Sequence, residues 1–206
     1  MRWGLLCVAL LLAACVGGGS RSPLPTARPQ VDTRQCLASL DRAGVRYKAL
    51  PDRDFAGGCR IRGAVQLLDI GMPVTNLGAI TCPVASNLTL WTREVRALAQ
   101  RHLRSDLVRL ESYGTYSCRS VNSRPGARLS EHAYANAVDI AAFVLKDGRR
   151  ITVKAGWNGG DASVRTFLRE AHRAGCRRFA ITIGPDGDAY HADHIHMDMG
   201  RGPYCR

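Results

Sequence analysis

The segment "NAVDIAAFVLKDGRRITVKAG", residues 136–156, decides the fold class. It holds two apolar runs separated by Asp147-Gly148, a dipeptide typical of the tight turn between two antiparallel strands. The segment therefore predicts a β-hairpin with its turn at Asp147-Gly148.

Helical patterns lie on either side of this hairpin in the sequence. Residues 82–103 carry Pro83 in the expected first turn and apolar residues at helical spacing, which indicates a long amphipathic helix. Residues 161–175 begin at a capping Asp161 and end at Gly175, which predicts a second helix. Helices mixed with hairpin-linked strands favour one α+β domain, with a small, largely antiparallel sheet flanked by helices.

Weaker patterns complete the expected domain. A short helix is predicted over residues 32–44, which start at Asp32 or Thr33 and stop at Gly44. Further strands are expected over residues 45–50, 59–68, 107–112, 177–184 and 194–199.

The N-terminus indicates export. One positive residue, Arg2, precedes an apolar run over residues 3–14 that is too short to span a membrane and suits a signal peptide. The run ends in Leu12-Ala13-Ala14-Cys15, which is similar to a bacterial lipobox with Cys15 as the lipidated residue. The alternative is an ordinary signal peptide cleaved nearby. We expect a lipoprotein signal peptide over residues 1–15, a flexible Gly/Pro/Ser-rich linker over 16–34 and a folded domain over 35–206.

Six cysteines remain once Cys7 and Cys15 are set aside. An even number in an exported chain predicts about three disulfides, and sequential pairing is the expectation. A zinc–thiolate site is the rival interpretation, but no two cysteines have the close spacing that such sites use. The expected pairs are Cys36–Cys59, Cys82–Cys118 and Cys176–Cys205.

The chain is strongly basic, with a formal net charge of +12 that arises mostly from arginine. A positive surface favours anionic partners, including nucleic acids. Because the arginines are scattered and no nucleic-acid-binding motif accompanies them, we expect a solvated basic surface and no nucleic-acid partner.

A histidine-rich segment, "HADHIHMD" over residues 191–198, suggests a metal site. If residues 194–199 form a strand, His194, His196 and Asp198 share one face. Two histidines on one face do not suffice, because zinc takes four ligands in structural sites, or three and a water in catalytic ones.

The segment "SEHAYANAVDI", residues 130–140, offers the missing ligands. Asp139 lies within an apolar run, where an unpaired carboxylate would be costly to bury, so a metal or a strong hydrogen-bond network is expected beside it. An edge strand with Asp139 in water is the alternative. His132, Asp139 and one C-terminal histidine would supply three N/O ligands and leave a position open, as in catalytic zinc sites.

These two segments together resemble the superfamily of lysostaphin, D-alanyl-D-alanine metallopeptidases and sonic hedgehog. Within it, "YSCRSVNSRPGARLSEHAYANAVDI" with "HADHIHMD" is similar to the extensin-like C-terminal domain of proteobacterial envelope proteins, over about residues 35–206. One departure is Ala135, where D-alanyl-D-alanine peptidases commonly carry glycine.

The resemblance implies that His132, Asp139 and His196 hold Zn²⁺. It also implies that His194 assists the water that attacks the substrate or stabilises the tetrahedral intermediate. Asp193 is a rival base, three residues before His196, but its side chain is short for that role and His194 is favoured.

Supporting residues follow from the same resemblance. Arg119 matches an arginine that binds substrate or stabilises the oxyanion, and the alternative is an ordinary surface charge. His191 is expected in a loop or in contact with substrate, and Asp198 is expected to orient a histidine. Ser130 would either hydrogen-bond a ligand or a peptide carbonyl or cap a turn. Two tyrosines would line the cleft or only pack, namely Tyr116 and Tyr134.

The expected function is a zinc metallopeptidase that acts on peptidoglycan stem peptides, as an endopeptidase or carboxypeptidase at a D-amino-acid centre. Its expected location is the periplasmic side of a bacterial cell envelope, anchored by a lipid, with the outer membrane favoured. Two alternatives remain: a non-catalytic metal-containing lipoprotein that binds peptidoglycan or a protein partner, and a structural lipoprotein whose histidines are satisfied by hydrogen bonds.

Overall fold

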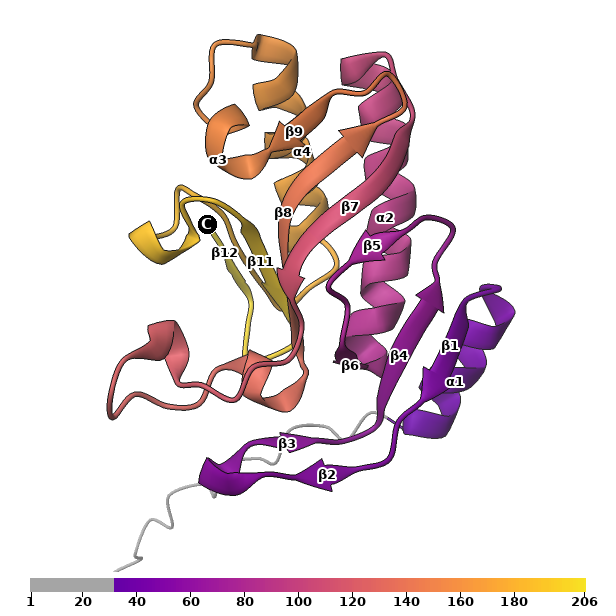
Figure 1. Cartoon of the computed structure of the whole chain (residues 1–206), viewed down its shortest axis with the longest axis vertical. Coiled ribbons are helices and arrows are strands. Elements are labelled where there is room, and N and C mark those ends of the chain that lie inside the picture. The colour runs from indigo at the N-terminus through magenta and orange to yellow at the C-terminus, as the bar shows by residue number, and fades with distance from the viewer. Residues whose placement is uncertain (1–31) are drawn as a thin grey trace, which may run out of the picture. The chain divides into compact units, whose positions relative to one another are not determined.

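The computed structural model describes residues 32–206, which form an α+β domain (Figure 1). The expected signal peptide, the lipidated Cys15 and most of the linker lie outside the described residues. The last two linker positions are helical, because α1 (Thr33–Arg42) begins at Thr33 and Asp32 caps it by accepting a hydrogen bond from the amide of Arg34 at 2.9 Å. The folded domain therefore begins two residues before the expected start at residue 35.

A seven-stranded sheet forms the centre of the domain. Its strand order is β12-β10-β11-β8-β7-β5, and β9 pairs with β8. Two pairs are parallel, β5 with β7 and β10 with β12, and the other pairs are antiparallel. The strands are β5 (Val74–Thr75), β7 (Leu107–Gly114), β8 (Ala137–Leu145), β9 (Arg150–Thr152), β10 (Ile181–Ile183), β11 (Ile195–Asp198) and β12 (Tyr204–Cys205).

Two smaller antiparallel sheets are built from strands in the N-terminal part of the described chain. One has the order β1-β4-β6 and the other pairs β2 with β3. Their strands are β1 (Arg46–Ala49), β2 (Arg53–Asp54), β3 (Arg60–Ile61), β4 (Ala64–Asp69) and β6 (Ala79–Thr81). The region expected to be one strand over residues 59–68 is thus divided between β3 and β4.

The two long helices agree with the sequence pattern. Helix α2 (Cys82–Leu103) carries Pro83 in its first turn, and α4 (Ala162–Cys176) is capped by Asp161. They lie together behind β7 and β8 in Figure 1. Residues 150–156, expected as a strand, leave the sheet after β9 because the next four residues form the short helix α3 (Val153–Gly156).

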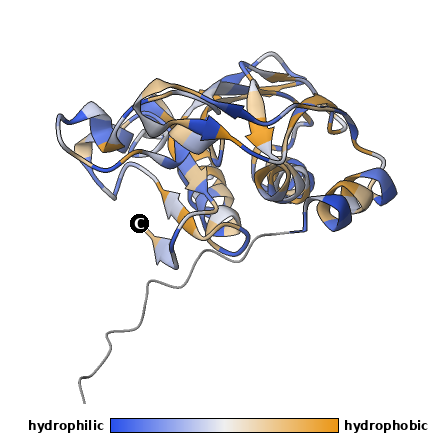
Figure 2. Ribbon diagram, turned by 90° about the horizontal axis from the view of Figure 1, so that it is seen from below, coloured by the Kyte–Doolittle hydropathy of each residue, from blue (hydrophilic) through white to orange (hydrophobic). Residues whose placement is uncertain are grey.

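The core lies between these helices and the sheet. Trp91 on α2 is fully buried and donates from Nε1 to the carbonyl of Ala171 on α4 at 2.9 Å. Its ring lies 6.1 Å from that of Phe143 on β8, which is 5.0 Å from the ring of Phe167. The ribbons of α1, α2 and α4 alternate between hydrophilic and hydrophobic residues in Figure 2, as amphipathic helices do.

Strand β8 is buried along almost its whole length and contains a bulge. Glu111 pairs with Ala142 and Ser112 pairs with Ile140, so Ala141 is an extra residue in the ladder. Val138 and Ile140 contribute to the core before the bulge, and Phe143 contributes after it. Because side chains alternate along a strand, Asp139 faces away from the helices.

Three disulfides link the elements, as expected in number, but two of the expected pairs were wrong. The observed pairs are Cys36–Cys82, Cys59–Cys118 and Cys176–Cys205. The first joins α1 to the start of α2, and the second joins the segment between η1 (Ala56–Gly58) and β3 to the loop after β7. Sequential pairing fails because α1 packs against α2, which brings Cys36 to Cys82.

No helix within residues 32–206 is both long and apolar enough to cross a membrane.

Candidate metal centre

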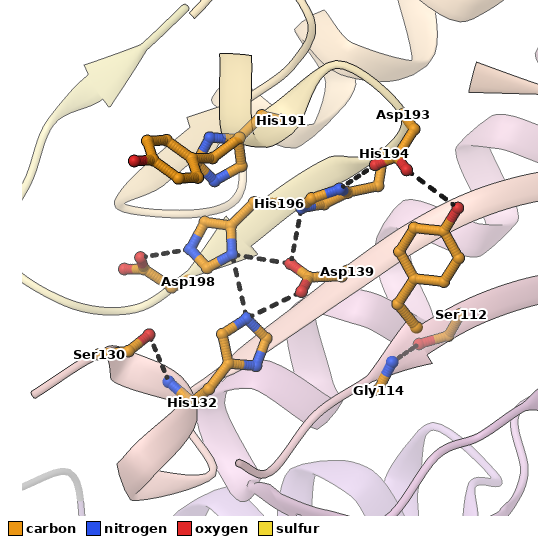
Figure 3. Close-up of polar contacts among 12 residues, drawn as sticks. Ser112, Gly114, Ser130, His132, Asp139, His191, Asp193, His194, His196 and Asp198 are labelled. Carbon is orange, nitrogen blue, oxygen red and sulfur yellow. Dashed lines mark hydrogen bonds and ion pairs between the residues drawn. The ribbon is translucent and has the colours of Figure 1, made fainter. Parts of the chain in front are cut away.

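Sheet register brings the three expected ligands together. Asp139 on β8 is the direct cross-strand partner of His196 on β11. His132 enters from the 3-10 turn η3 (Glu131–Tyr134), just before β8. His196 Nδ1 lies 2.8 Å from Asp139 Oδ1, and His132 Nε2 lies 3.1 Å from Asp139 Oδ2 (Figure 3). The three residues are between 3% and 7% exposed, and their ligand atoms lie within 4.8 Å of one another, so they could hold a metal ion.

Contacts on the far side of each ring show which tautomer would bind a metal. His132 Nδ1 lies 3.0 Å from the carbonyl oxygen of Thr115, which can only accept, so Nδ1 is the donor. His196 has a carboxylate 2.8 Å from each ring nitrogen, Asp198 at Nε2 and Asp139 at Nδ1. A metal would take the tautomer with hydrogen on His196 Nε2, in which His132 Nε2 and His196 Nδ1 are lone pairs.

These lone pairs face each other across 3.2 Å, beside the carboxylate of Asp139. Such a set of acceptors needs a cation among them, either a proton or a metal ion. In the metal-free protein a proton serves: burial lowers the pKa of His196, but hydrogen bonds to Asp139 and Asp198 outweigh it and raise the pKa to about 9. The donor set thus fits a divalent metal with N/O preference.

A cavity of about 220 Å³ opens onto this cluster. His132, Asp139 and His196 line it, together with five of the other expected site residues: Arg119, Ser130, His191, His194 and Asp198. An Arg119 guanidinium nitrogen lies 4.0 Å from Asp139 Oδ2. His191, on η4 (Ala189–His191), donates from Nδ1 to Asp188 at 2.7 Å.

His194 and Asp193 have different places in the site. His194 lines the cavity, and its Nε2 lies 3.6 Å from Asp139 Oδ1. Its Nδ1 donates to Asp193 Oδ1 at 2.9 Å, which leaves Nε2 as the lone pair that faces the cluster. Asp193 is not among the residues that line the cavity, and its second oxygen accepts from the hydroxyl of Tyr113 at 3.4 Å. The geometry therefore makes Asp193 the residue that orients His194.

Ser130 and the two tyrosines have structural partners. Ser130 lines the cavity and also caps η3, because its Oγ accepts from the amide of His132 at 3.3 Å. Tyr116 stacks near Phe55 and Tyr134 lies under the guanidinium of Arg60, and neither tyrosine lines the cavity.

Ala135 ends the η3 turn in the left-handed region, with φ of 53°. A residue with a Cβ is strained there, whereas glycine is not.

A second group of metal-ligating residues has a different chemistry. His172, Cys176 and Cys205 also lie close enough together to hold an ion. Cys176 and Cys205 form a disulfide, so their sulfurs are not thiolates and the group is not a metal site in this state.

Two contributors to the site were missed in the sequence. Asp188 holds His191 and stands three residues before it, a spacing that could have indicated the pair. Thr115 acts through its main-chain carbonyl, for which no sequence pattern gives a signal.

A family model of the extensin-like protein C-terminus matches residues 34–206. The chain belongs to the extensin-like C-terminal family. The extensin-like domain thus contains every described strand, all three disulfides and the His132–Asp139–His196 cluster. Among the curated proteins and the solved structures, none matches this chain.

Proposed function

We propose that this extensin-like protein is a zinc-dependent hydrolase of peptidoglycan peptides. The observation that carries the proposal is a buried set of two histidine lone pairs and a carboxylate, open to a cavity that also contains a histidine with a free Nε2 lone pair. Metallopeptidases need both parts, a metal with an open position and a neighbouring base.

Zn²⁺ would be held by His132 Nε2, His196 Nδ1 and the carboxylate of Asp139. When bound, it would act as a Lewis acid that polarises the scissile carbonyl and makes water more acidic. Thr115 and Asp198 hold the two imidazoles in the correct tautomer.

The proton-transfer role belongs to His194. Its Nε2 faces the cluster and can accept a proton from the attacking water and return it to the leaving amine. Asp193 fixes the ring and stabilises its protonated form. The guanidinium of Arg119, at the cavity wall, would stabilise the negative charge that develops on the carbonyl oxygen.

The substrate class follows from the proposed export and from the resemblance to the lysostaphin and D-alanyl-D-alanine peptidase superfamily. An exported hydrolase, lipid-anchored at Cys15 on the periplasmic side of a bacterial envelope, would meet peptidoglycan stem peptides. Asp193 does not occupy the cavity, which favours the histidine-base form of the mechanism.

The test combines metal analysis with digestion of purified sacculi. We expect one zinc per chain in the wild type, and release of muropeptides that is lost in His196→Ala along with the metal. His194→Ala should keep the zinc and lose the hydrolysis. His102→Ala is the matched control, because His102 pairs with Glu170 outside the cavity. Zinc without any release of muropeptides would favour a binding module, and absence of zinc would contradict the proposal.

A further inference from the structure

We propose that Arg128 and Asn122 form a subsite for a carboxylate of the substrate, beside the metal cluster. The inference rests on the proposed function and deepens it, because it names the chemical group that the substrate must carry. Both residues line the cavity and belong to the loop between β7 and β8, which projects from the lower end of the sheet in Figure 1.

Three acidic residues and two arginines, Arg119 and Arg128, line the cavity. Its three acidic residues already have partners in the protein: Asp139 contacts the two ligand histidines, Asp198 accepts from His196, and Glu131 accepts from the amide of Asn136 at 2.7 Å. The cationic side chains are therefore the ones with capacity to bind an anion.

Arg128 has the greatest capacity among them. Its guanidinium forms no ion pair or hydrogen bond with any residue in the range 32–206, and the same holds for the side-chain amide of Asn122. Arg119, by comparison, lies 4.0 Å from Asp139. A guanidinium binds a carboxylate through two parallel N–H donors, and an amide adds a third.

The loop that carries both residues is held in place. The Cys59–Cys118 disulfide and a bridge between Ser120 and Leu129 close its base. The amide of Val121 donates to the carbonyl of Arg128 at 2.9 Å, so the main chain of Arg128 is fixed at the cavity wall. A fixed loop binds a ligand without a large ordering cost.

Two residues of the loop also have left-handed backbone conformations. Asn122 and Ser123 both have positive φ, 54° and 53°, and both line the cavity. Non-glycine residues in this region are uncommon and gather at ligand sites, where the surrounding structure holds them. This observation is independent of the charge argument and locates the subsite at the same wall.

The small cavity limits where the carboxylate can be on the substrate. Because the metal cluster and Arg128 share a volume of about 220 Å³, the recognised carboxylate lies close to the scissile bond. It is either the C-terminal carboxylate of the peptide, which would make the protein a carboxypeptidase, or a side-chain carboxylate next to that bond. Both sources present the same group to Arg128.

Arg124 provides a matched control on the same loop. Like Arg128, it is exposed and makes no ion pair with a described residue, but it does not line the cavity. Arg124→Gln therefore removes the same charge as Arg128→Gln without touching the proposed subsite.

The experiment measures binding by calorimetry in the zinc-loaded His194→Ala background, which prevents turnover. The probes are acetyl-Lys-D-Ala-D-Ala as the free acid and as the C-terminal amide, and a stem peptide with a meso-diaminopimelate carboxylate, free or amidated. We expect Arg128→Gln to weaken binding of one free acid about tenfold and to leave the corresponding amide unchanged. Asn122→Ala should show a smaller loss with the same selectivity, and Arg124→Gln none.

The pair of probes that shows the effect identifies the source of the carboxylate. Equal weakening of acid and amide, or no weakening in Arg128→Gln, would overturn the subsite. The proposed function can fail separately. If the wild-type protein binds the free acids selectively but cleaves none of the peptides, the carboxylate subsite stands and the hydrolase proposal is contradicted.

Discussion

Asp139 is an acidic side chain in an otherwise apolar, buried strand. Burial alone would raise its pKa, but the interactions with His132 and His196 outweigh burial and hold the pKa well below its usual value. Its charge is stable there only with these partners or a metal, because an isolated buried carboxylate is costly.

At the same scale, Asp198 should control metal affinity without being a ligand. Asp198→Asn weakens the acceptor for His196 Nε2 and so reduces the bias toward the tautomer with a lone pair on Nδ1. We expect the zinc dissociation constant to rise about 10- to 100-fold, measured by competition with a chelator.

Asp188→Asn is the control for this prediction. Asp188 also accepts from a cavity histidine, His191, but that histidine is outside the proposed ligand set. Equal losses of zinc affinity in the two variants would show that general disturbance of the cavity explains the effect.

Among the elements, the loop between β7 and β8 depends on the Cys59–Cys118 disulfide. A double Cys→Ser variant should lower the free energy of unfolding by about 2–4 kcal/mol, because the bridge closes a long chain segment. Arg119 follows Cys118 directly, so hydrolysis should fall as well, even at temperatures where the variant is folded.

The Cys36–Cys82 bridge offers the comparison, since it joins α1 to α2 and none of the residues that line the cavity lies beside it. Its double serine variant should lose stability and retain hydrolysis when folded. Thermal unfolding and sacculus digestion measure the two effects, and equal loss of hydrolysis in both variants would contradict a local role for Cys59–Cys118.

Helix α4 should make the domain sensitive to mild acid through His172. Burial lowers the pKa of this histidine in the folded state, although its hydrogen bond to the Arg206 carbonyl acts in the opposite direction. The pKa of histidine in the unfolded chain is about 6.5. Below that pH the unfolded chain binds a proton that the folded chain does not, so the free energy of unfolding decreases as the pH is lowered.

The measurement is urea unfolding at about pH 7.5 and about pH 5.5, on either side of that value. We expect a smaller loss of stability at the lower pH in His172→Gln than in the wild type. The prediction is wrong if the two proteins lose the same amount.

For the whole molecule, stability depends on the core around α2. Leu88 is fully buried within it, whereas Leu90 on the same helix is 41% exposed. Leu88→Ala should reduce the free energy of unfolding by about 2–5 kcal/mol, and Leu90→Ala by much less than that. Denaturant titration of both variants checks the difference, and similar losses would place the core elsewhere.

Much of the fold could be predicted because its signals are local. Pro83 and the helical spacing behind it marked α2, and Asp147-Gly148 marked the turn between β8 and β9. The short strands β5, β6 and β12 have no such pattern, since each is only two or three residues long and depends on its neighbour in the sheet.

The candidate site could likewise be predicted from the sequence only in part. The residue types of His132, Asp139 and His196 indicated a metal cluster, and the structure brings the three together. Arg128 was not singled out, because one arginine among many in a basic chain carries no signal until a fold places it at a cavity.

The sequence by itself determined the class of the fold, the places of the main helices and hairpin, and the chemistry that the histidines and Asp139 can supply. These depend on properties of single residues and on spacing within one element. Only the tertiary structure decided which cysteines pair, which nitrogen of each histidine faces the cluster, and that Asp193 supports His194. Each of these depends on contacts between distant parts of the chain, which form only when the strands are in register and the helices have packed.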